Sequence, residues 1–286
     1  MPEISTVGIV SKPKIAESAD VVRGLLEWLG ARGIRYRLDE ETAKGVGLTD
    51  FVPREELAEI ADLIIVLGGD GTLLSAARAV GGRDIPLFAV NLGRLGFLTA
   101  IKLEELYPEL ERALRGEHRI GRRHMIDCEL VRDDRTIARY SALNDVVMAK
   151  SDIARMIDLD AYVDHHFVAA YKADGLIIAT PTGSTAYSLS AGGPIIFPSV
   201  GAFCITPICP HMLTNRPVIV PDTSIIQILN HSDEGTFLTI DGQVGEPIAK
   251  GDRVICRASS KTISLIRPPK MLFFDVLREK LKWGER

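Results

Sequence analysis

The sequence lacks the features that mark several large classes of protein. Lysine and arginine number 34 against 38 aspartates and glutamates, a net charge of −4, so no basic excess favours binding to DNA or RNA. No apolar run reaches the roughly 18 residues needed to span a bilayer, and the first residues lack the apolar core of a signal peptide. We therefore expect a cytoplasmic protein with no nucleic-acid partner and no membrane partner.

Cysteine is scarce and poorly spaced for binding metal. None of the four cysteines forms a CxxC pair, and the only close histidines, His165 and His166, are neighbours that would face opposite sides of a strand. We expect no zinc site, and we expect reduced, buried thiols at all four cysteines. These are Cys128, Cys204, Cys209 and Cys256.

The first hundred residues alternate strand and helix patterns. Strands are expected at 7–10, 34–38, 63–67 and 87–90, of which 34–38 alternates as a half-buried strand does, and helices are expected at 15–29 and 73–79. This βαβ pattern is typical of an open α/β sheet. We expect an α/β nucleotide-binding domain over residues 1–115, although the helical stretch 103–114 fits either side of the boundary.

The second half of the chain has the pattern of a β-rich domain. Residues 157–163 alternate apolar and polar side chains, as in a half-buried strand. Short strand-like runs recur around Val146, Ile177, Ile226, Leu238, Val254 and Ile263. We expect this domain to span 116–269, and we expect a final helix, with Phe274, Leu277 and Leu281 on one stripe, to pack back on the first domain from within 270–286.

A glycine-rich turn joins the strand at 63–67 to the following helix. Its residues are Gly68, Gly69, Asp70, Gly71 and Thr72. Glycines at the carboxyl end of a strand let the backbone approach phosphate, and the helix dipole favours negative charge there. A carboxylate in such a turn makes sense if Asp70 binds Mg²⁺ or accepts a proton from an attacking hydroxyl. The alternative is a plain turn in which Asp70 caps the helix through Thr72.

Three further segments carry polar groups at strand ends. Residues 174–190 are an apolar strand that runs into a turn with five serine and threonine hydroxyls between Thr180 and Ser188. Asn144-Asp145 precedes an apolar strand, and Asp241-Gly242-Gln243 follows another. Each is compatible with an ordinary surface turn when taken alone.

Together with the glycine turn, and in this order, these segments resemble the NAD kinase family, specifically its bacterial type. The resemblance extends from about residue 63 to 269 and implies an ATP- and Mg²⁺-dependent kinase that phosphorylates the adenosine ribose 2′-hydroxyl of NAD to give NADP. It also implies a homo-oligomer, a dimer or a tetramer. The glycine turn alone is shared with lipid kinases of the diacylglycerol type, which are similar to this family.

The resemblance also implies roles for individual residues. Asp70 is the expected proton acceptor, Gly71 lines its pocket, and Gly68, Gly69 and Thr72 bind phosphate. Asn144 and Asp145 hold the adenosine ribose, and Phe97 lies beside the ligand unless it is an ordinary core residue. The remaining expected contacts to NAD are Arg155, Lys172, Asp174, Thr185, Ala186, Tyr187, Ser188, Leu189, Ser190 and Gln243.

The chain departs from the family pattern at two positions. Lys172 stands two residues before Asp174, where many members have arginine next to the aspartate, and lysine lacks the bidentate fork of arginine. Ser75 stands where a basic residue often occurs. Arg155 is expected at the pyrophosphate or as a solvated surface residue.

Two other functions fit parts of the sequence. A lipid kinase would share the glycine turn and would need an exposed apolar entrance for its substrate. A non-catalytic NAD sensor would keep the binding residues without the reaction, but a carboxylate beside phosphates gives such a sensor no advantage. We therefore expect the protein to be an NAD kinase.

Overall fold

The computed structural model describes residues 4–12, 18–93, 95–151, 156–233, 235–269 and 272–284. The chain divides into two compact units: unit 1 comprises Met1–Arg122 and Thr262–Arg286, and unit 2 comprises Arg123–Lys261. It passes from one unit to the other inside two long strands, β6 (Arg119–Arg132) and β17 (Arg253–Arg267). The boundaries expected from the sequence lie at 115/116 and 269/270, whereas the units change at 122/123 and 261/262, seven and eight residues away.

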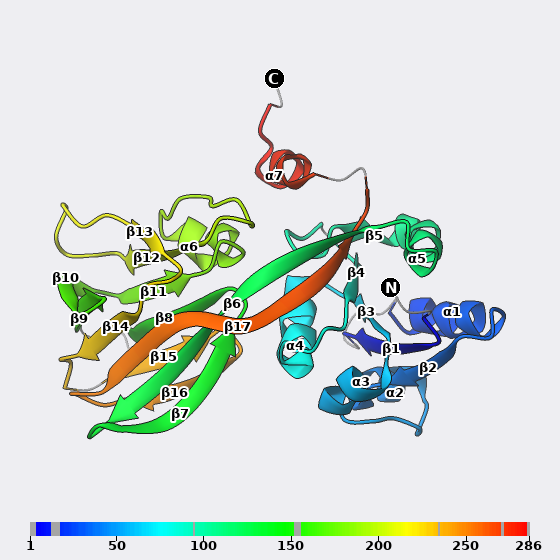
Figure 1. The fold of residues 1–286 in the computed structure, drawn as a ribbon, viewed down its shortest axis with the longest axis horizontal. Coiled ribbons are helices and arrows are strands. Elements are labelled where there is room, and N and C mark those ends of the chain that lie inside the picture. Colours follow the sequence, from blue (N-terminus) through cyan, green and yellow to red (C-terminus); the bar gives the residue numbers. More distant parts are fainter. Residues whose placement is uncertain are drawn as a thin grey trace. The chain divides into compact units, whose positions relative to one another are not determined.

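Unit 1 is an α/β unit built on a parallel sheet (Figure 1). Besides the ends of β6 and β17, its elements are β1 (Thr6–Ser11), α1 (Ser18–Gly30), β2 (Arg35–Leu38), α2 (Glu40–Val46), α3 (Arg54–Ile60), β3 (Leu63–Leu67), α4 (Asp70–Val80), β4 (Leu87–Asn91), β5 (Ile101–Lys102), η1 (Leu103–Glu105), α5 (Leu106–Leu114) and α7 (Phe273–Leu281). The strand order β4-β3-β1-β2 is parallel throughout, β5 pairs in parallel with β4, and the end of β17 pairs with β4 through Leu265 and Leu87.

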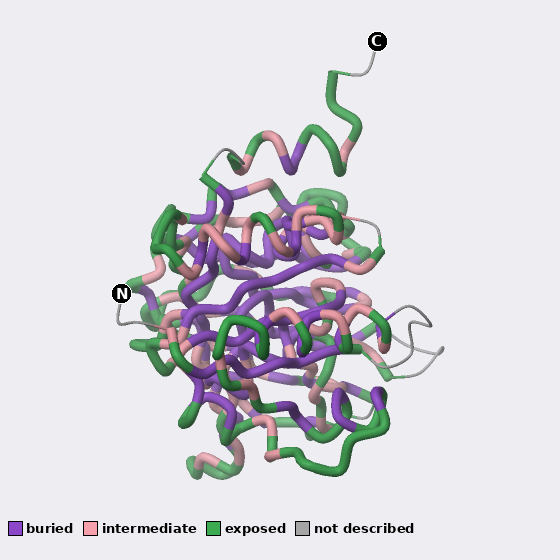
Figure 2. Tube along the Cα trace, turned by 90° about the vertical axis from the view of Figure 1, so that its right-hand side faces the viewer, coloured by how far each residue is buried: buried purple, intermediate pink, exposed green. Residues whose placement is uncertain are grey.

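The central strands of unit 1 are apolar because helices cover both of their faces. Leu25 of α1 and Leu110 of α5 share one core cluster with Ile9 and Ile65 of the strands. On the other face, α3 and α4 contact each other and β1. In Figure 2 the buried stretches form the long purple tracts, and α7, next to the C-terminal end, is mostly exposed or half-buried. Parallel strands covered on two faces are expected to be continuously apolar, as the run 63–67 is.

Unit 2 consists mainly of antiparallel strands. Besides parts of β6 and β17, its elements are β7 (Arg135–Ala142), β8 (Asp145–Lys150), β9 (Ile157–Val163), β10 (His166–Ala173), β11 (Gly175–Ala179), η2 (Gly183–Thr185), α6 (Tyr187–Ser190), β12 (Ala202–Ile208), β13 (Val218–Pro221), β14 (Ile226–Asn230), β15 (Thr236–Ile240) and β16 (Val244–Ile248). One sheet has the order β13-β12-β11-β8-β15-β16, and the other strands pair in the order β10-β9-β14-β17, with β6 pairing β17 and β7. The described core between these sheets is formed by residues such as Met148, Leu176, Phe203 and Leu238.

The expected fold class, an α/β unit followed by a β-rich unit, is confirmed. Two details were wrong. Val254 and Ile263 were expected in separate strands and lie in the single strand β17, because Ser259 and Ser260 continue the strand without a turn. Cys209 was expected to be buried, and it is exposed just after β12 with a φ of 44°, whereas the other three thiols are buried.

Several elements carried no clear sequence pattern. The short helices α2 and α3 and the hairpin of β6 and β7 were not predicted. In the final helix, α7, Val276 and Leu277 are buried, whereas Phe274, which was expected on the packed stripe, is 57% exposed. Within the described residues, no helix is long and apolar enough to cross a membrane. The same residues include no group of three or more His, Cys, Asp or Glu side chains able to hold a metal ion.

Candidate functional site

Asp70 is the first residue of α4, directly after the glycine turn that follows β3. Its carboxylate accepts hydrogen bonds from three successive backbone N–H groups of the loop after β4. Oδ2 accepts from Phe97 N at 2.9 Å, and Oδ1 accepts from Leu98 N at 3.1 Å and Thr99 N at 3.0 Å. The predicted alternative, a cap made by Asp70 through Thr72, is not what the carboxylate does, because Gly69 occupies the N-cap position.

A side-chain relay supports the same carboxylate. The Thr99 hydroxyl lies 3.0 Å from Asp70 Oδ1, and Asn91 Nδ2 donates to that hydroxyl at 2.7 Å. Because a hydroxyl has a single proton and Asn91 is the donor in the second bond, Thr99 must donate its proton to Asp70. A Cβ atom on Gly96 would lie 2.0 Å from Asp70 Oδ1, so only glycine lets this loop close around the carboxylate.

The glycine turn uses some of its amides internally. Gly68 N donates to Val90 O at 2.9 Å, which continues the sheet, and Thr72 N donates to Gly69 O at 3.0 Å, which begins the helix. Gly71 is exposed and Thr72 is half-buried. Phosphate binding by Gly68, Gly69 and Thr72 therefore stays a prediction. Because the amides of Gly68 and Thr72 are already bonded, the positive end of the α4 dipole would contribute more to such binding than these two amides do.

In unit 2 the sequence pair Asn144-Asp145 lies next to Asp241. The Asp241 carboxylate accepts from Leu143 N at 3.0 Å, Asn144 N at 2.7 Å and Asp145 N at 3.1 Å. Asn144, Asp145 and Asp241 keep 8%, 5% and 8% of their surface exposed. Within the described chain Asn144 Oδ1 is buried and has no hydrogen-bond partner. An unsatisfied buried acceptor costs about 1–3 kcal/mol, and a ligand hydroxyl would satisfy it.

These groups line a cavity of about 330 Å³. That volume is at the lower end of the range for small-molecule sites, roughly 300–1,000 Å³. The cavity combines a polar corner with apolar walls and one aromatic side chain, which suits a ribose and a flat heterocycle. Its lining residues are Asn144, Asp145, Val147, Ala149, Ala186, Tyr187, Thr239, Asp241 and Gly242.

The two carboxyl groups in this cavity interact electrostatically. Burial, followed by the negative charge of Asp241, raises the pKa of Asp145 to about 7. Desolvation and a neighbouring like charge both disfavour the ionised form of a carboxyl group. Near neutral pH Asp145 therefore exists partly as a protonated group that can donate a hydrogen bond.

The hydroxyl-rich segment is largely internal. Ser184 Oγ donates to Pro181 O, Thr185 Oγ1 donates to Thr182 O, and Ser188 Oγ bonds with Thr206 Oγ1 at 2.9 Å. These hydroxyls hold the turn and α6 in shape, and Tyr187 is left 47% exposed beside the cavity. Ligand contacts by Thr185, Ser188, Leu189 and Ser190 stay predictions.

The structure pairs Asp174 with a residue that the sequence did not single out. Lys150 Nζ lies 2.6 Å from Asp174 Oδ1, and both side chains are about one-third exposed. Lys172 is exposed on β10, and Gln243 is exposed in the turn after β15. Arg155 lies outside the described residues. Lys150 is the last residue of β8, which is the neighbour of β11 in the sheet, so its proximity to Asp174 follows from the strand pairing and not from the local sequence.

Phe97 is half-buried in unit 1. Besides the amide that binds Asp70, its carbonyl accepts from Arg267 Nη2 at 3.4 Å. The ammonium of Lys280 in α7 lies 5.5 Å from the centre of the Phe97 ring, a cation–π distance. The ring thus has a cation of α7 over it, and a contact with NAD stays a prediction.

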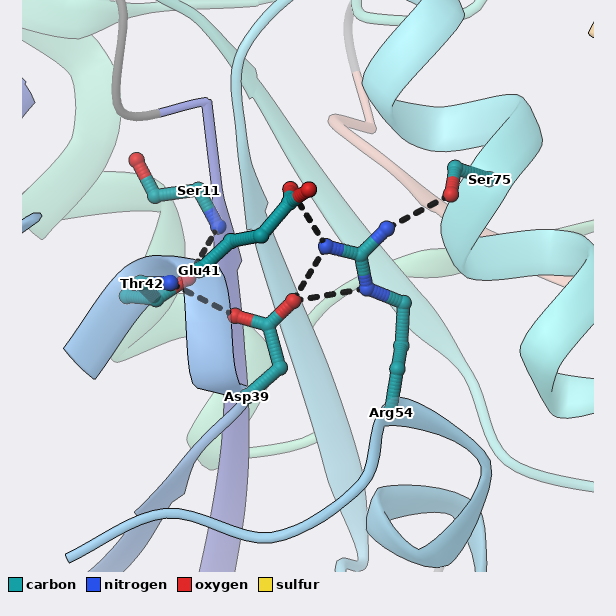
Figure 3. Close-up of polar contacts among 6 residues, drawn as sticks. All are labelled: Ser11, Asp39, Glu41, Thr42, Arg54 and Ser75. Carbon is teal, nitrogen blue, oxygen red and sulfur yellow. Dashed lines mark hydrogen bonds and ion pairs between the residues drawn. The ribbon is translucent and has the colours of Figure 1, made fainter. Parts of the chain in front are cut away.

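A charge cluster braces the first turns of α4. Figure 3 shows the Arg54 guanidinium between the carboxylates of Asp39 and Glu41 and the hydroxyl of Ser75 on α4. Arg54 Nε lies 2.6 Å from Asp39 Oδ2, and Nη1 donates to Ser75 Oγ at 2.6 Å. Asp39 is almost fully buried and also caps α2 through Thr42 N. Arg54 therefore brings a positive charge next to Ser75, where the sequence has no basic residue.

The fold and these groups define a class of protein, a phosphotransferase for a nucleotide substrate. Unit 1 has an acidic glycine turn at the carboxyl end of a parallel sheet, which is where open α/β sheets bind phosphate. Unit 2 has a cavity with a polar corner and apolar walls that suits a ribose and a base.

Comparisons with known proteins identify the family. The family model for the ATP-NAD kinase N-terminal domain matches residues 7–118, and that for the ATP-NAD kinase C-terminal domain matches 143–268. An NAD kinase of Solibacter usitatus is 65% identical over all of both chains, and one of Koribacter versatilis is 50% identical over 99% of this chain and all of the relative. The chain belongs to the NAD kinase family, whose members are enzymes.

Solved structures agree with this assignment. A yeast NADH kinase in complex with NADH has a TM-score of 0.93 and 26% identity, with all of this chain and 90% of that chain covered. An NAD kinase from Archaeoglobus fulgidus in complex with ATP has a TM-score of 0.80 and 27% identity, with 98% and 100% covered. The expected kinase family is confirmed, and the lipid kinase and the non-catalytic sensor are set aside.

Proposed function

We propose that the chain transfers the γ-phosphoryl group of ATP to the 2′-hydroxyl of the adenosine ribose of NAD, with Asp70 as the proton acceptor. The ribose oxygen forms a bond to the γ-phosphorus as the bond from that phosphorus to the β–γ bridging oxygen breaks. ADP leaves with the electron pair of the broken bond, and the hydroxyl proton goes to Asp70. The products are NADP and ADP. The single observation that carries the proposal is the placement of Asp70, a carboxylate held by fixed donors at the first residue of α4, where phosphate binding is expected.

The hydrogen bonds of Asp70 favour one oxygen for this role. Oδ1 accepts three hydrogen bonds, whereas within the described residues Oδ2 accepts only that of Phe97 N. A carboxylate has about four acceptor sites, two on each oxygen, so Oδ2 has the free capacity. The donors around Oδ1 would repel a metal cation, and we therefore favour proton transfer to Oδ2 over metal binding by Asp70.

Asn144 and Asp145 are proposed to bind the adenosine ribose. Asn144 Oδ1 would accept a hydrogen bond from a ribose hydroxyl and so gain the partner it lacks within the described chain. Asp145, protonated in part near pH 7, would donate to a ribose oxygen without adding a negative charge beside the pyrophosphate. Tyr187 offers a flat face for a base.

Mg²⁺ is proposed to enter with ATP. The described residues offer no cluster of three metal-binding side chains, which fits an ion held mainly by phosphate oxygens and water. When bound, the ion would neutralise charge on the phosphates. The protein's own part is to position the reacting hydroxyl and to remove its proton.

A homo-oligomer, a dimer or a tetramer, and a cytoplasmic location complete the proposal. Phe167 and Val168 are exposed on β10, which ends its sheet, and an exposed apolar edge is a common site of subunit contact. Light scattering of the purified protein tests the oligomer, and fractionation of cells tests the location.

The activity is tested with purified protein, NAD, ATP and Mg²⁺. A dehydrogenase strictly specific for NADP should report product, phosphorus NMR should show a monoester on the adenosine ribose, and EDTA should stop the reaction. Diacylglycerol in detergent micelles is the control acceptor. ATP consumption that depends on lipid and not on NAD, or NAD binding without product, would contradict the proposal.

A further inference from the structure

Asp241 stands out because its carboxylate accepts from three consecutive amides, those of Leu143, Asn144 and Asp145, and the last two residues are the expected ribose contacts. Asp241 directly follows β15, whose last residue, Ile240, pairs with Val146 of β8. Its φ of 51° and the φ of 63° at Gly242 belong to the turn between β15 and β16, which Gln243 N closes by donating to Ile240 O at 3.0 Å. Aspartate followed by glycine is a preferred pair in such hairpin turns, so the turn places the Asp241 carboxylate at the end of β15.

The contacts between Asp241 and Asp145 are reciprocal. Asp241 N donates to Asp145 O at 3.0 Å, while Asp145 N donates to Asp241 Oδ1 at 3.1 Å. With Leu143 N and Asn144 N, three successive amides point into one carboxylate. Consecutive N–H groups that converge in this way form an anion-binding concavity, and here the anion is supplied by the protein itself.

The backbone of Asn144 is fixed from its other side as well. Its carbonyl accepts from Thr180 N at 2.9 Å, and the Thr180 hydroxyl donates to Leu143 O. A Cβ atom on Gly183 would lie 2.1 Å from Asn144 O, so the hydroxyl-rich turn packs directly against this carbonyl. The backbone polar groups of Asn144 are thus bonded within the protein. Asn144 lines the cavity, and its side-chain Oδ1 is buried without a partner in the described chain.

We propose that Asp241 is a positioning residue for NAD: its carboxylate fixes the backbone of Asn144 and Asp145 so that their side chains face the ribose. Asp241 acts through these two residues and need not touch the ligand. The inference rests on the proposed function, in which Asn144 and Asp145 bind the ribose. The inference assigns Asp241 as the residue that shapes the ribose site, and it gives a reason why a carboxylate is buried there beside the carboxyl group of Asp145.

The test compares Asp241→Asn with a matched control in the same unit. Asn keeps the size of the side chain but replaces one acceptor oxygen with a donor, which must face at least one of the three amides. We expect the KM for NAD to rise at least about fivefold, the cost of one or more lost buried contacts, while the KM for ATP changes less than about twofold. Asp252→Asn is the control, because Asp252 is also buried and accepts a backbone amide, that of Ala249, together with Arg132.

A double-mutant cycle separates positioning from a general loss of stability. In an Asn144→Ala background, Asp241→Asn should weaken NAD binding, measured by calorimetry, much less than it does in the parent, because contacting residues that act through one another are not additive. Additive effects, or an unchanged KM for NAD, would overturn the inference. So would an Asp241→Asn protein that fails to fold, since the carboxylate would then serve the stability of unit 2.

The proposed function is judged separately. If Asn144→Ala and Asp145→Ala leave NAD binding unchanged, the assignment of the ribose site itself fails. If those variants weaken binding and Asp241→Asn does not, only the positioning role fails. The two failures therefore give different patterns in the same set of measurements.

Discussion

The replacement of Asp70 by Asn tests the proposed chemistry most directly, and the structure determines how the new side chain must lie. Oδ1 of Asp70 accepts from two amides and the Thr99 hydroxyl, whereas Oδ2 accepts from Phe97 N alone. An Asn side chain can place its NH₂ group at either position. At the Oδ1 position the group would face three donors, and at the Oδ2 position it would face one, so Asn should place its NH₂ group where Oδ2 was.

The oxygen assigned to accept the proton is therefore the one that Asn removes. Loss of a general base typically lowers the rate by about 10²–10⁴, which corresponds to roughly 3–5 kcal/mol of transition-state stabilisation. The lost hydrogen bond to Phe97 N should cost the folded state about 1–3 kcal/mol in addition. We expect kcat to fall by two to four orders of magnitude while the dissociation constant for NAD changes less than about tenfold.

The assay is steady-state formation of NADP, with NAD binding measured by calorimetry on the same preparation. Asp62→Asn is the matched control, because the Asp62 carboxylate also accepts two successive amides in unit 1, those of Ser5 and Thr6, at 2.9 Å each. The control should lose stability and keep its kcat. Turnover close to that of the parent in Asp70→Asn would refute the assigned role, and an equal loss of kcat in both variants would show that folding is being measured.

Three other changes have defined outcomes. Thr99→Val, which removes the hydroxyl that donates to Asp70, should lower kcat by about three- to tenfold and leave the dissociation constant for NAD unchanged; the reverse pattern would contradict the relay. Because the pKa of Asp145 is raised to about 7, this group's contribution to the free energy of unfolding should fall as pH rises from about 4 to 7. In denaturant titrations between pH 5 and 7, the free energy of unfolding of Asp145→Asn should therefore rise by roughly 2–3 kcal/mol relative to that of the parent. Parallel pH profiles for the two proteins would contradict this. Arg54→Met should lower the free energy of unfolding by about 3–5 kcal/mol because it leaves the buried Asp39 carboxylate unpaired. Adding Asp39→Asn should restore part of that loss. If Arg54→Met changes the free energy of unfolding by less than about 1 kcal/mol, the charge cluster around Arg54 does not stabilise the fold.

The sequence predicted the elements that depend on local pattern. The apolar run 63–67 is β3 to the residue, and the alternating run 157–163 is β9, because burial on two faces and on one face leave different periods in the sequence. The helix after the glycine turn begins at Asp70, three residues before the predicted start, since Gly69 and not a later residue serves as its N-cap. Helix ends depend on single hydrogen bonds, and an apolar period does not report them.

What the sequence could not predict is which distant backbone groups meet the functional side chains. The donors of Asp70 lie 27 to 29 residues along the chain, and those of Asp241 lie 96 to 98 residues back. No local pattern connects residues at such separations, because the contact depends on which strands are neighbours in the sheet. Lys150, which pairs with Asp174, escaped notice for the same reason.

The same arrangement of one carboxylate and three amides occurs once in each unit. Asp70 is the first residue of α4 in unit 1, Asp241 directly follows β15 in unit 2, and each carboxylate accepts from three successive amides of another segment. A carboxylate held by three amides has little freedom to rotate, and the loop that supplies the amides is held as firmly as the carboxylate. In unit 1 the carboxylate itself, that of Asp70, is proposed to accept the proton. In unit 2 the segment that supplies the amides carries Asn144 and Asp145, which are proposed to bind the ribose. Since the positions of these groups are set by backbone donors, conservative changes at either aspartate should alter activity more than changes at Ser184 or Thr185, whose hydroxyls bond with their own turn.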